Sequence, residues 1–137
     1  MTSNENSRGP LRQKIETIFQ QILESPVYDK ALIEDYFSPE YVQHVDGKTL
    51  TYAHFLQHVE TQKERISQLK ISIDAFVEQG NECSSVHCVK AMTQDGRKIL
   101  VKVIAHFKFH EGKLVSCDEL TRLIEGKIED ADVGSCA

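Results

Sequence analysis

Asp118 is the residue whose type and surroundings point most directly to chemistry. It lies within residues 99–124, a stretch that reads as a long β-hairpin. The predicted buried face of this hairpin is apolar apart from Ser116, Asp118 and Arg122. A carboxylate on an apolar face is costly unless it is paired or used, and desolvation would raise its pKa toward that of a general base. The competing interpretation is an ion pair of Asp118 with Arg122 or Lys90 on the same face.

Two further candidates, His44 and Tyr41, lie in a segment without clear periodicity between two predicted helices. Histidine is the natural proton shuttle near neutral pH, and either side chain could stabilise a developing oxyanion. The competing interpretation of His44 is a surface histidine on a loop. Asp46 in the same segment is expected to start a turn with Gly47.

Asp74 and His87 form a third polar pair. The predicted register places them directly opposite each other on neighbouring strands, but on the face away from the apolar one. We therefore expect a cross-strand ion pair rather than a catalytic pair.

The cysteines and histidines favour neither a metal centre nor a disulfide framework. No cysteine pair has the C-x-x-C spacing, and a chain of this length needs no covalent staples. His54 and His58 are four residues apart within a predicted helix, and we expect a solvated helix face there. The sequence thus predicts reduced thiols and neither metal nor cofactor. The four cysteines are Cys83, Cys88, Cys117 and Cys136.

Composition limits the class of protein. The chain has 137 residues, 40% of them hydrophobic, and a net charge of −5, which suits one globular domain. The acidic balance and the absence of a basic cluster argue against nucleic acid as a partner. No apolar run resembles a signal peptide or is long enough to span a bilayer, so we expect a cytoplasmic protein without a membrane partner.

Hydrophobic periodicity predicts three helices followed by strands. Residues 1–9 are polar and expected to be disordered, and apolar spacing predicts helices over 10–24, 28–37 and 52–67. Thr51 suits the N-cap of the third helix. Residues 40–50 are expected to be irregular, and residues 127–137 to form a tail on the surface.

The period then changes to two, which predicts four antiparallel strands joined by two-residue turns at Gly80-Asn81, Asp95-Gly96 and Glu111-Gly112. These turns place Val103, Phe107 and Asp118 on one largely apolar face. A β-bulge would invert every residue beyond it. The opposite face is half apolar, with Ile104 among its members, and predicts a homodimer interface.

Three features of the chain resemble the nuclear-transport-factor-2-like superfamily, specifically its SnoaL-like branch. They are YFSPEYVQHVDGKTL at 36–50, the helix after it, and the hairpin FKFHEGKLVSCDELTRLIEG at 107–126. The resemblance implies a cone-shaped, cystatin-like α+β barrel over residues 10–126, with three N-terminal helices packed on a curved four-stranded antiparallel sheet. It also implies a hydrophobic pocket between helices and sheet.

In catalytic members of that family, an acidic residue near the closing strand or a His/Asp pair transfers a proton on a hydrophobic substrate. The matching positions are Asp118 and His44, with Tyr41 nearby. The sequence therefore predicts a small-molecule pocket, with isomerase- or cyclase-type chemistry in which Asp118 is the general base. The alternative is a non-catalytic module that binds an apolar small molecule or only dimerises.

Overall fold

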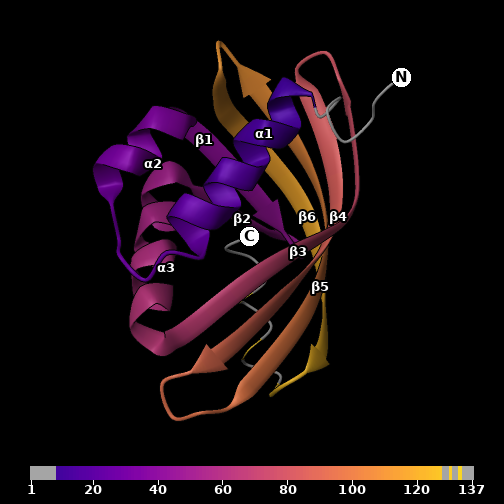
Figure 1. Ribbon diagram of the computed structural model, residues 1–137. Helices are drawn as coiled ribbons and strands as arrows, with labels where there is room; N and C mark the ends of the chain where they lie inside the picture. Colours follow the sequence, from indigo (N-terminus) through magenta and orange to yellow (C-terminus); the bar gives the residue numbers. More distant parts are fainter. Residues whose placement is uncertain (1–8, 128–129, 131–132, 134–137) are drawn as a thin grey trace.

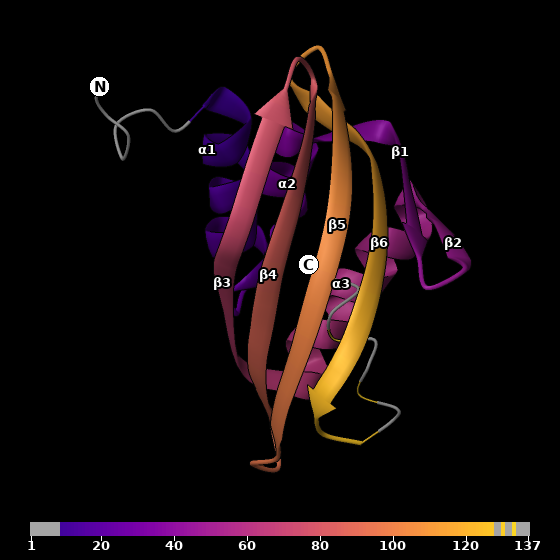
Figure 2. The same ribbon diagram turned by 90° about the vertical axis from the view of Figure 1, so that its right-hand side faces the viewer.

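The computed structural model describes residues 9–127, 130 and 133, so the predicted disordered stretch lies outside the described residues except for Gly9. The helices lie together on one side of a strongly curled sheet, and the view onto the other side shows the long strands in front of them (Figures 1 and 2). The elements are α1 (Pro10–Thr17), η2 (Ile18–Leu23), α2 (Lys30–Tyr36), β1 (Phe37–Val45), β2 (Lys48–Thr51), α3 (Tyr52–Arg65), β3 (Ile66–Gln79), β4 (Glu82–Thr93), β5 (Lys98–His110) and β6 (Lys113–Glu125).

The three predicted helices are present, but their predicted order before all the strands is wrong, because β1 and β2 lie between α2 and α3. The first helix changes from α to π geometry at Ile18, and this π segment forms η2. Thr51 caps α3 as predicted, because its hydroxyl accepts a hydrogen bond of 3.3 Å from the His54 amide. The ammonium group of Lys63 on α3 donates to the Leu23 carbonyl at 3.0 Å, which satisfies an orphan carbonyl at the end of η2.

The sheet has six strands in the order β2-β1-β6-β5-β4-β3, so the predicted four-stranded sheet is wrong in strand number. Most of the segment predicted to be irregular is the hairpin β1–β2, which turns at Asp46 and Gly47, both with positive φ. Strand β1 runs parallel to β6. Pro39 obscured this strand, since proline is rare within sheets, but it falls where the pairing of β1 with β6 is interrupted.

Two local irregularities change which residues face the helices. Five residues, 93–97, separate the paired Met92 and Lys98, whereas a two-residue turn leaves an even number between partners, so β4 is shifted by one position. A register shift at Lys108 and Phe109 then inverts most of β6. The face predicted for β5 is confirmed: Val103 and Phe107 are buried. The faces predicted for β4 and for most of β6 are wrong, because one extra residue turns every later side chain over.

The C-terminal segment after β6 contributes to the packed domain. Asp130 and Val133 are both fully buried, and Val133 belongs to the hydrophobic core. At these two positions the chain is therefore not a surface tail, while the remaining residues after Lys127 lie outside the described part.

Candidate functional site

Glu119 is the acidic side chain that the fold places on the concave face. It lies on β6, is 2% exposed, and faces inward beside the small residue Ala105 of β5. The amide of Gln43 on β1 donates from Nε2 to Glu119 Oε1 at 3.0 Å. The hydroxyl of Tyr41 donates in turn to Gln43 Oε1 at 2.7 Å. The parallel pairing of β1 with β6 thus builds a buried chain from Tyr41 through Gln43 to Glu119.

This environment disfavours the charged form of the Glu119 carboxyl. Burial raises its pKa well above the ordinary value, and the negative charges of Asp46 and Asp118 raise it further. Its second oxygen, Oε2, has no hydrogen-bond partner. A protonated carboxyl can accept on one oxygen and donate from the other, so Oε2 carries an unused donor.

His87 is a second buried polar group on the same face. It is fully buried on β4, packs against the Phe19 ring with centroids 4.8 Å apart, and lies 2.9 Å from the Ser85 hydroxyl through Nδ1. Burial lowers its pKa to about 4, although the charge of Asp74 acts in the opposite direction, so the ring is neutral. Its Nε2 has no partner. Glu119 and His87 lie two strands apart, on the order of 10 Å across the sheet.

The structure separates the predicted site residues. Tyr41 is buried in the chain that ends at Glu119, whereas Asp118 and His44 are exposed on the outer face, in register with each other. The predicted position of Asp118 on the buried face is wrong, because the shift in β6 turns it outward. His44 Nδ1 lies 3.1 Å from the Thr49 hydroxyl. Whether Asp118 or His44 takes part in catalysis stays a prediction.

The predicted ion pair of Asp74 and His87 is also wrong. His87 pairs in register with Ile73 and points inward, while Asp74 accepts from the Cys88 thiol at 3.5 Å. The same one-residue shifts account for both corrections. Sequence alone offered one usable signal for Glu119: it follows Cys117 at a spacing of two, so the alternative register of β6 places both inside.

For the cysteines and histidines, the sequence predicted reduced thiols and no metal site. Cys83, Cys88 and Cys117 are free thiols, and burial raises the pKa of Cys83 to about 12. Cys136 lies outside the described residues. Within residues 9–127, 130 and 133, no three His, Cys, Asp or Glu side chains are grouped as metal ligands.

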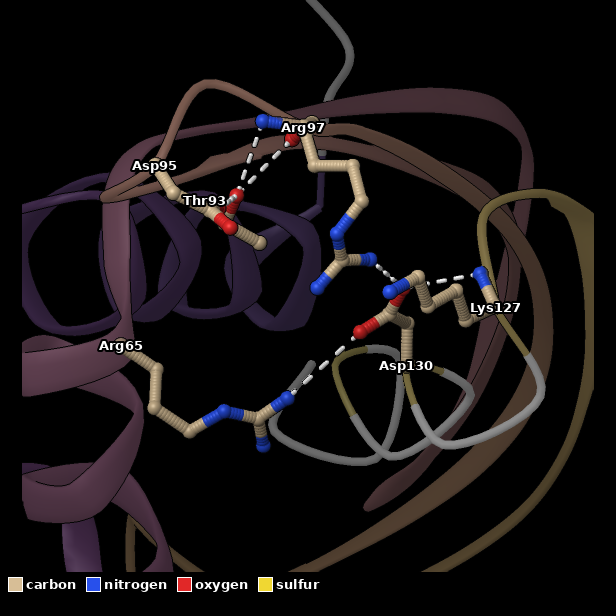
Figure 3. Close-up of polar contacts among 6 residues, drawn as sticks. All are labelled: Arg65, Thr93, Asp95, Arg97, Lys127 and Asp130. Carbon is tan, nitrogen blue, oxygen red and sulfur yellow. Dashed lines mark hydrogen bonds and ion pairs between the residues drawn. The ribbon is translucent and has the colours of Figure 1, made fainter.

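At the end of the sheet opposite the β5–β6 turn, Arg65, Arg97 and Asp130 form a cluster of ion pairs, here called the clasp (Figure 3). The Asp130 carboxylate pairs with the guanidinium of Arg97, lies 3.7 Å from that of Arg65, and accepts from the Lys127 amide at 2.8 Å. Burial raises the pKa of Asp130, but the hydrogen bonds from Lys127 and Arg97 and the two positive charges outweigh burial and lower it overall.

Open grooves lie elsewhere on the molecule. One of about 260 Å³ runs along the end of α3, and another of about 570 Å³ lies over the ends of β3, β4 and β5. Glu119 lines neither groove.

One relative belongs to the same family as this chain at the sequence level. The chain is 34% identical over 107 residues to an uncharacterized protein of Schizosaccharomyces pombe (strain 972), and the match covers 78% of this chain and 82% of that protein. No family model matches the chain.

Solved structures show the same fold. IdmH of Streptomyces antibioticus, a candidate polyketide cyclase, is 11% identical with a TM-score of 0.68 and covers 85% of this chain and 93% of its own. A candidate SnoaL-like polyketide cyclase of Jannaschia sp. CCS1 is 11% identical, with a TM-score of 0.65 and coverages of 96% and 97%. An LEH-like epoxide hydrolase of Mycobacterium tuberculosis is 9% identical, with a TM-score of 0.64 and coverages of 89% and 86%.

The chain has the fold of the nuclear-transport-factor-2-like and SnoaL-like proteins. The α+β cone implied by the resemblance is therefore confirmed, with six strands in place of four. In the part of the chain that the structure describes, no helix has the length and apolar character to cross a membrane.

Proposed function

We propose that the protein binds a small, mainly apolar molecule between its helices and the concave face of the sheet, and that Glu119 transfers a proton on it. The observation that carries this proposal is the Glu119 carboxyl, which is buried and whose Oε2 has no hydrogen-bond partner among the described residues. An unpaired polar atom in the interior destabilises the fold, so its presence favours a role toward a ligand. Glu119 replaces Asp118 as the proposed acid and base.

The chemistry is of isomerase or cyclase type. Neutral Glu119 donates its Oε2 proton to a ligand carbonyl oxygen, and the resulting carboxylate takes a proton from the adjacent carbon. The carbonyl compound becomes its enol and Glu119 regains a proton, so atoms and charge balance. Gln43 Nε2 donates to Oε1 and stabilises the transient carboxylate, while Tyr41 holds the Gln43 amide in place.

The names of the structural neighbours support a small organic substrate. Two are candidate polyketide cyclases and a third is an epoxide hydrolase. The location that we propose for the activity is the cytoplasm, as the composition predicts. A second candidate function is non-catalytic binding of an apolar molecule, which the nearly complete burial of Glu119 favours.

Hydrogen exchange at carbon tests the proposal. The protein is incubated in D₂O with a panel of small cyclic ketones, and loss of the α-proton signal is followed by proton NMR. Glu119→Gln keeps the shape of the side chain and removes the acid, so exchange should fall by about 100-fold or more. Asp118→Asn is the matched control, because it changes the adjacent but exposed carboxylate.

Each outcome has a definite reading. Exchange at the same rate in Glu119→Gln overturns the proposed role of Glu119. A loss of exchange in Asp118→Asn alone would assign the base to the outer face. Ketone binding without exchange in the native protein favours the binding module.

We also propose a homodimer through the outer face of the sheet. Four large apolar side chains lie exposed there, among them Ile104 and Leu120, which are 56% and 66% exposed and neighbours in register. Lys102 and Arg122 lie on one side of this pair along the strands, and Asp118 lies on the other. A twofold axis through the apolar pair would bring opposite charges together. The other two exposed apolar residues are Val77 and Ile124.

Light scattering tests the dimer. Ile104→Asp should yield a monomer that remains folded, because an unpaired charge in the interface is strongly unfavourable. Val27→Asp is the control, since Val27 is 64% exposed but lies outside the sheet. A monomeric native protein at micromolar concentration would contradict the proposal.

A further inference from the structure

A groove of about 260 Å³ lies where the end of η2, the last turns of α3 and the start of β3 meet. Its volume is slightly below the roughly 300–1,000 Å³ typical of sites for drug-sized ligands, so it suits a compound with a single ring. The wall is mainly apolar between a few polar groups. The apolar lining residues are Leu23, Pro26, Val59, Ile66 and Leu69.

Gln62 is the unusual polar group in this lining. It follows Phe55 and Val59 on the inward stripe of α3 and is 5% exposed. Neither Nε2 nor Oε1 has a hydrogen-bond partner. A buried amide normally makes several hydrogen bonds, and leaving both ends unpaired carries a large desolvation penalty.

The charged groups in the same lining are already occupied. The Lys63 ammonium donates to the carbonyls of Leu23 and Ser25. The Glu24 carboxylate accepts from the Ile71 amide at 2.7 Å and lies 4.0 Å from the Lys70 ammonium. The recognition capacity that remains is therefore neutral and consists of one donor beside one acceptor.

We infer that this groove is a binding site for a neutral ligand whose edge carries an acceptor next to a donor, such as a primary carboxamide or a lactam. The two hydrogen bonds would satisfy Gln62, and the apolar wall would cover the ring. A carboxylate fits less well, because its second oxygen would face Gln62 Oε1, acceptor against acceptor. The site does not depend on the proposed role of Glu119, since Tyr41, Gln43 and Glu119 are absent from its lining.

Benzamide is the probe, titrated into the ¹⁵N-labelled full chain and followed by NMR. Saturable shifts are expected at the Gln62 side-chain amide and in residues 66–69. N,N-dimethylbenzamide keeps the acceptor but loses the donor, so it should bind about tenfold more weakly, the scale of one lost hydrogen bond. Benzoate should be weakened at least as much.

Two glutamine variants locate the interaction. Gln62→Met keeps the length of the side chain and removes both polar atoms, so benzamide affinity should fall about tenfold or more. Gln68→Met is the matched control, because Gln68 lines the same groove with an exposed side chain that water already satisfies. Its benzamide affinity should stay within about twofold.

The native spectral dispersion of each variant shows that it is folded. The inference is overturned if Gln62→Met is folded and binds benzamide like the native chain, or if the shifts map to another surface. It is also overturned if no saturable shift occurs up to about 50 mM, since a ligand of this size should bind in the millimolar range.

Discussion

Glu119 and Asp130 are both buried carboxyl groups, yet their surroundings shift their pKa values in opposite directions. Asp130 is surrounded by two guanidinium groups and a backbone amide, and its pKa is lowered. Glu119 has only the neutral amide of Gln43 as a partner, and its pKa is raised. Burial is common to both, so the partners decide the charge.

The contrast extends to what each group does for the fold. Asp130 joins the end of α3 to the β4–β5 connection and so fastens the C-terminal segment, a structural task. Among the described residues, Glu119, His87 and Gln62 each keep a buried polar atom with neither a hydrogen bond nor an ion pair, whereas Asp130 Oδ1, which also lacks a hydrogen bond, lies 3.7 Å from the Arg65 guanidinium. Natural proteins tolerate such defects chiefly where function requires them. The interior between α3 and the concave face is therefore the region in which to seek a ligand.

The largest expected effect concerns the pH dependence of stability at Glu119. Its folded pKa is raised above the ordinary 4.5, so its contribution is complete below that pH and is lost as the pH rises toward the folded value. Glu119→Gln lacks this titration. Above pH 4.5, the free energy of unfolding of the variant should therefore rise relative to that of the native protein, by up to about 1.4 kcal/mol per pH unit. Urea unfolding at several pH values measures this difference. A constant difference from pH 5 to 8 would show that Glu119 is ionised when folded.

The contribution of Asp130 to stability should change with pH in the opposite direction. Its pKa is lowered from 3.8, so its stabilisation is present above that value and is lost as the pH falls through the folded pKa. At neutral pH, Asp130→Asn should lower the free energy of unfolding by about 2–3 kcal/mol. The loss is smaller than for a fully buried ion pair, because both arginines are about one third exposed.

Glu125→Gln serves as the control for Asp130→Asn, since Glu125 is an exposed acid near the same end of the sheet. The control should unfold like the native protein. A loss of less than about 0.5 kcal/mol in Asp130→Asn would mean that the clasp contributes no more than a surface pair.

Much of the fold follows from the sequence. The three helices, the Thr51 cap, the buried face of β5 and two of the three predicted turns are confirmed because local periodicity and turn residues specify them. Strand β1 was not recognised, because it contains Pro39 and pairs with a strand about 75 residues later. Such non-local pairing leaves little local signal.

The site was harder to predict than the fold for a geometric reason. Asp118 and Glu119 are adjacent, and side chains in a strand alternate between faces, so one bulge decides which acid is buried. The register shift at Lys108 and Phe109 places Glu119 on the buried face. No local residue pattern predicts that shift. Tyr41 was found through the family resemblance, and the structure places it within the chain that ends at Glu119.

The last prediction compares two buried glutamines, Gln43 and Gln62, which are 2% and 5% exposed. Gln43 has a partner at each end of its amide, whereas Gln62 has none. Gln62→Leu should therefore raise the free energy of unfolding by about 1–2 kcal/mol, since it removes an uncompensated desolvation penalty. Gln43→Leu should lower it by about 1–3 kcal/mol, because it leaves Tyr41 and Glu119 unpaired. Urea unfolding of both variants measures the difference, and destabilisation by Gln62→Leu equal to that of Gln43→Leu would show that the Gln62 amide is satisfied in solution and has no vacancy for a ligand.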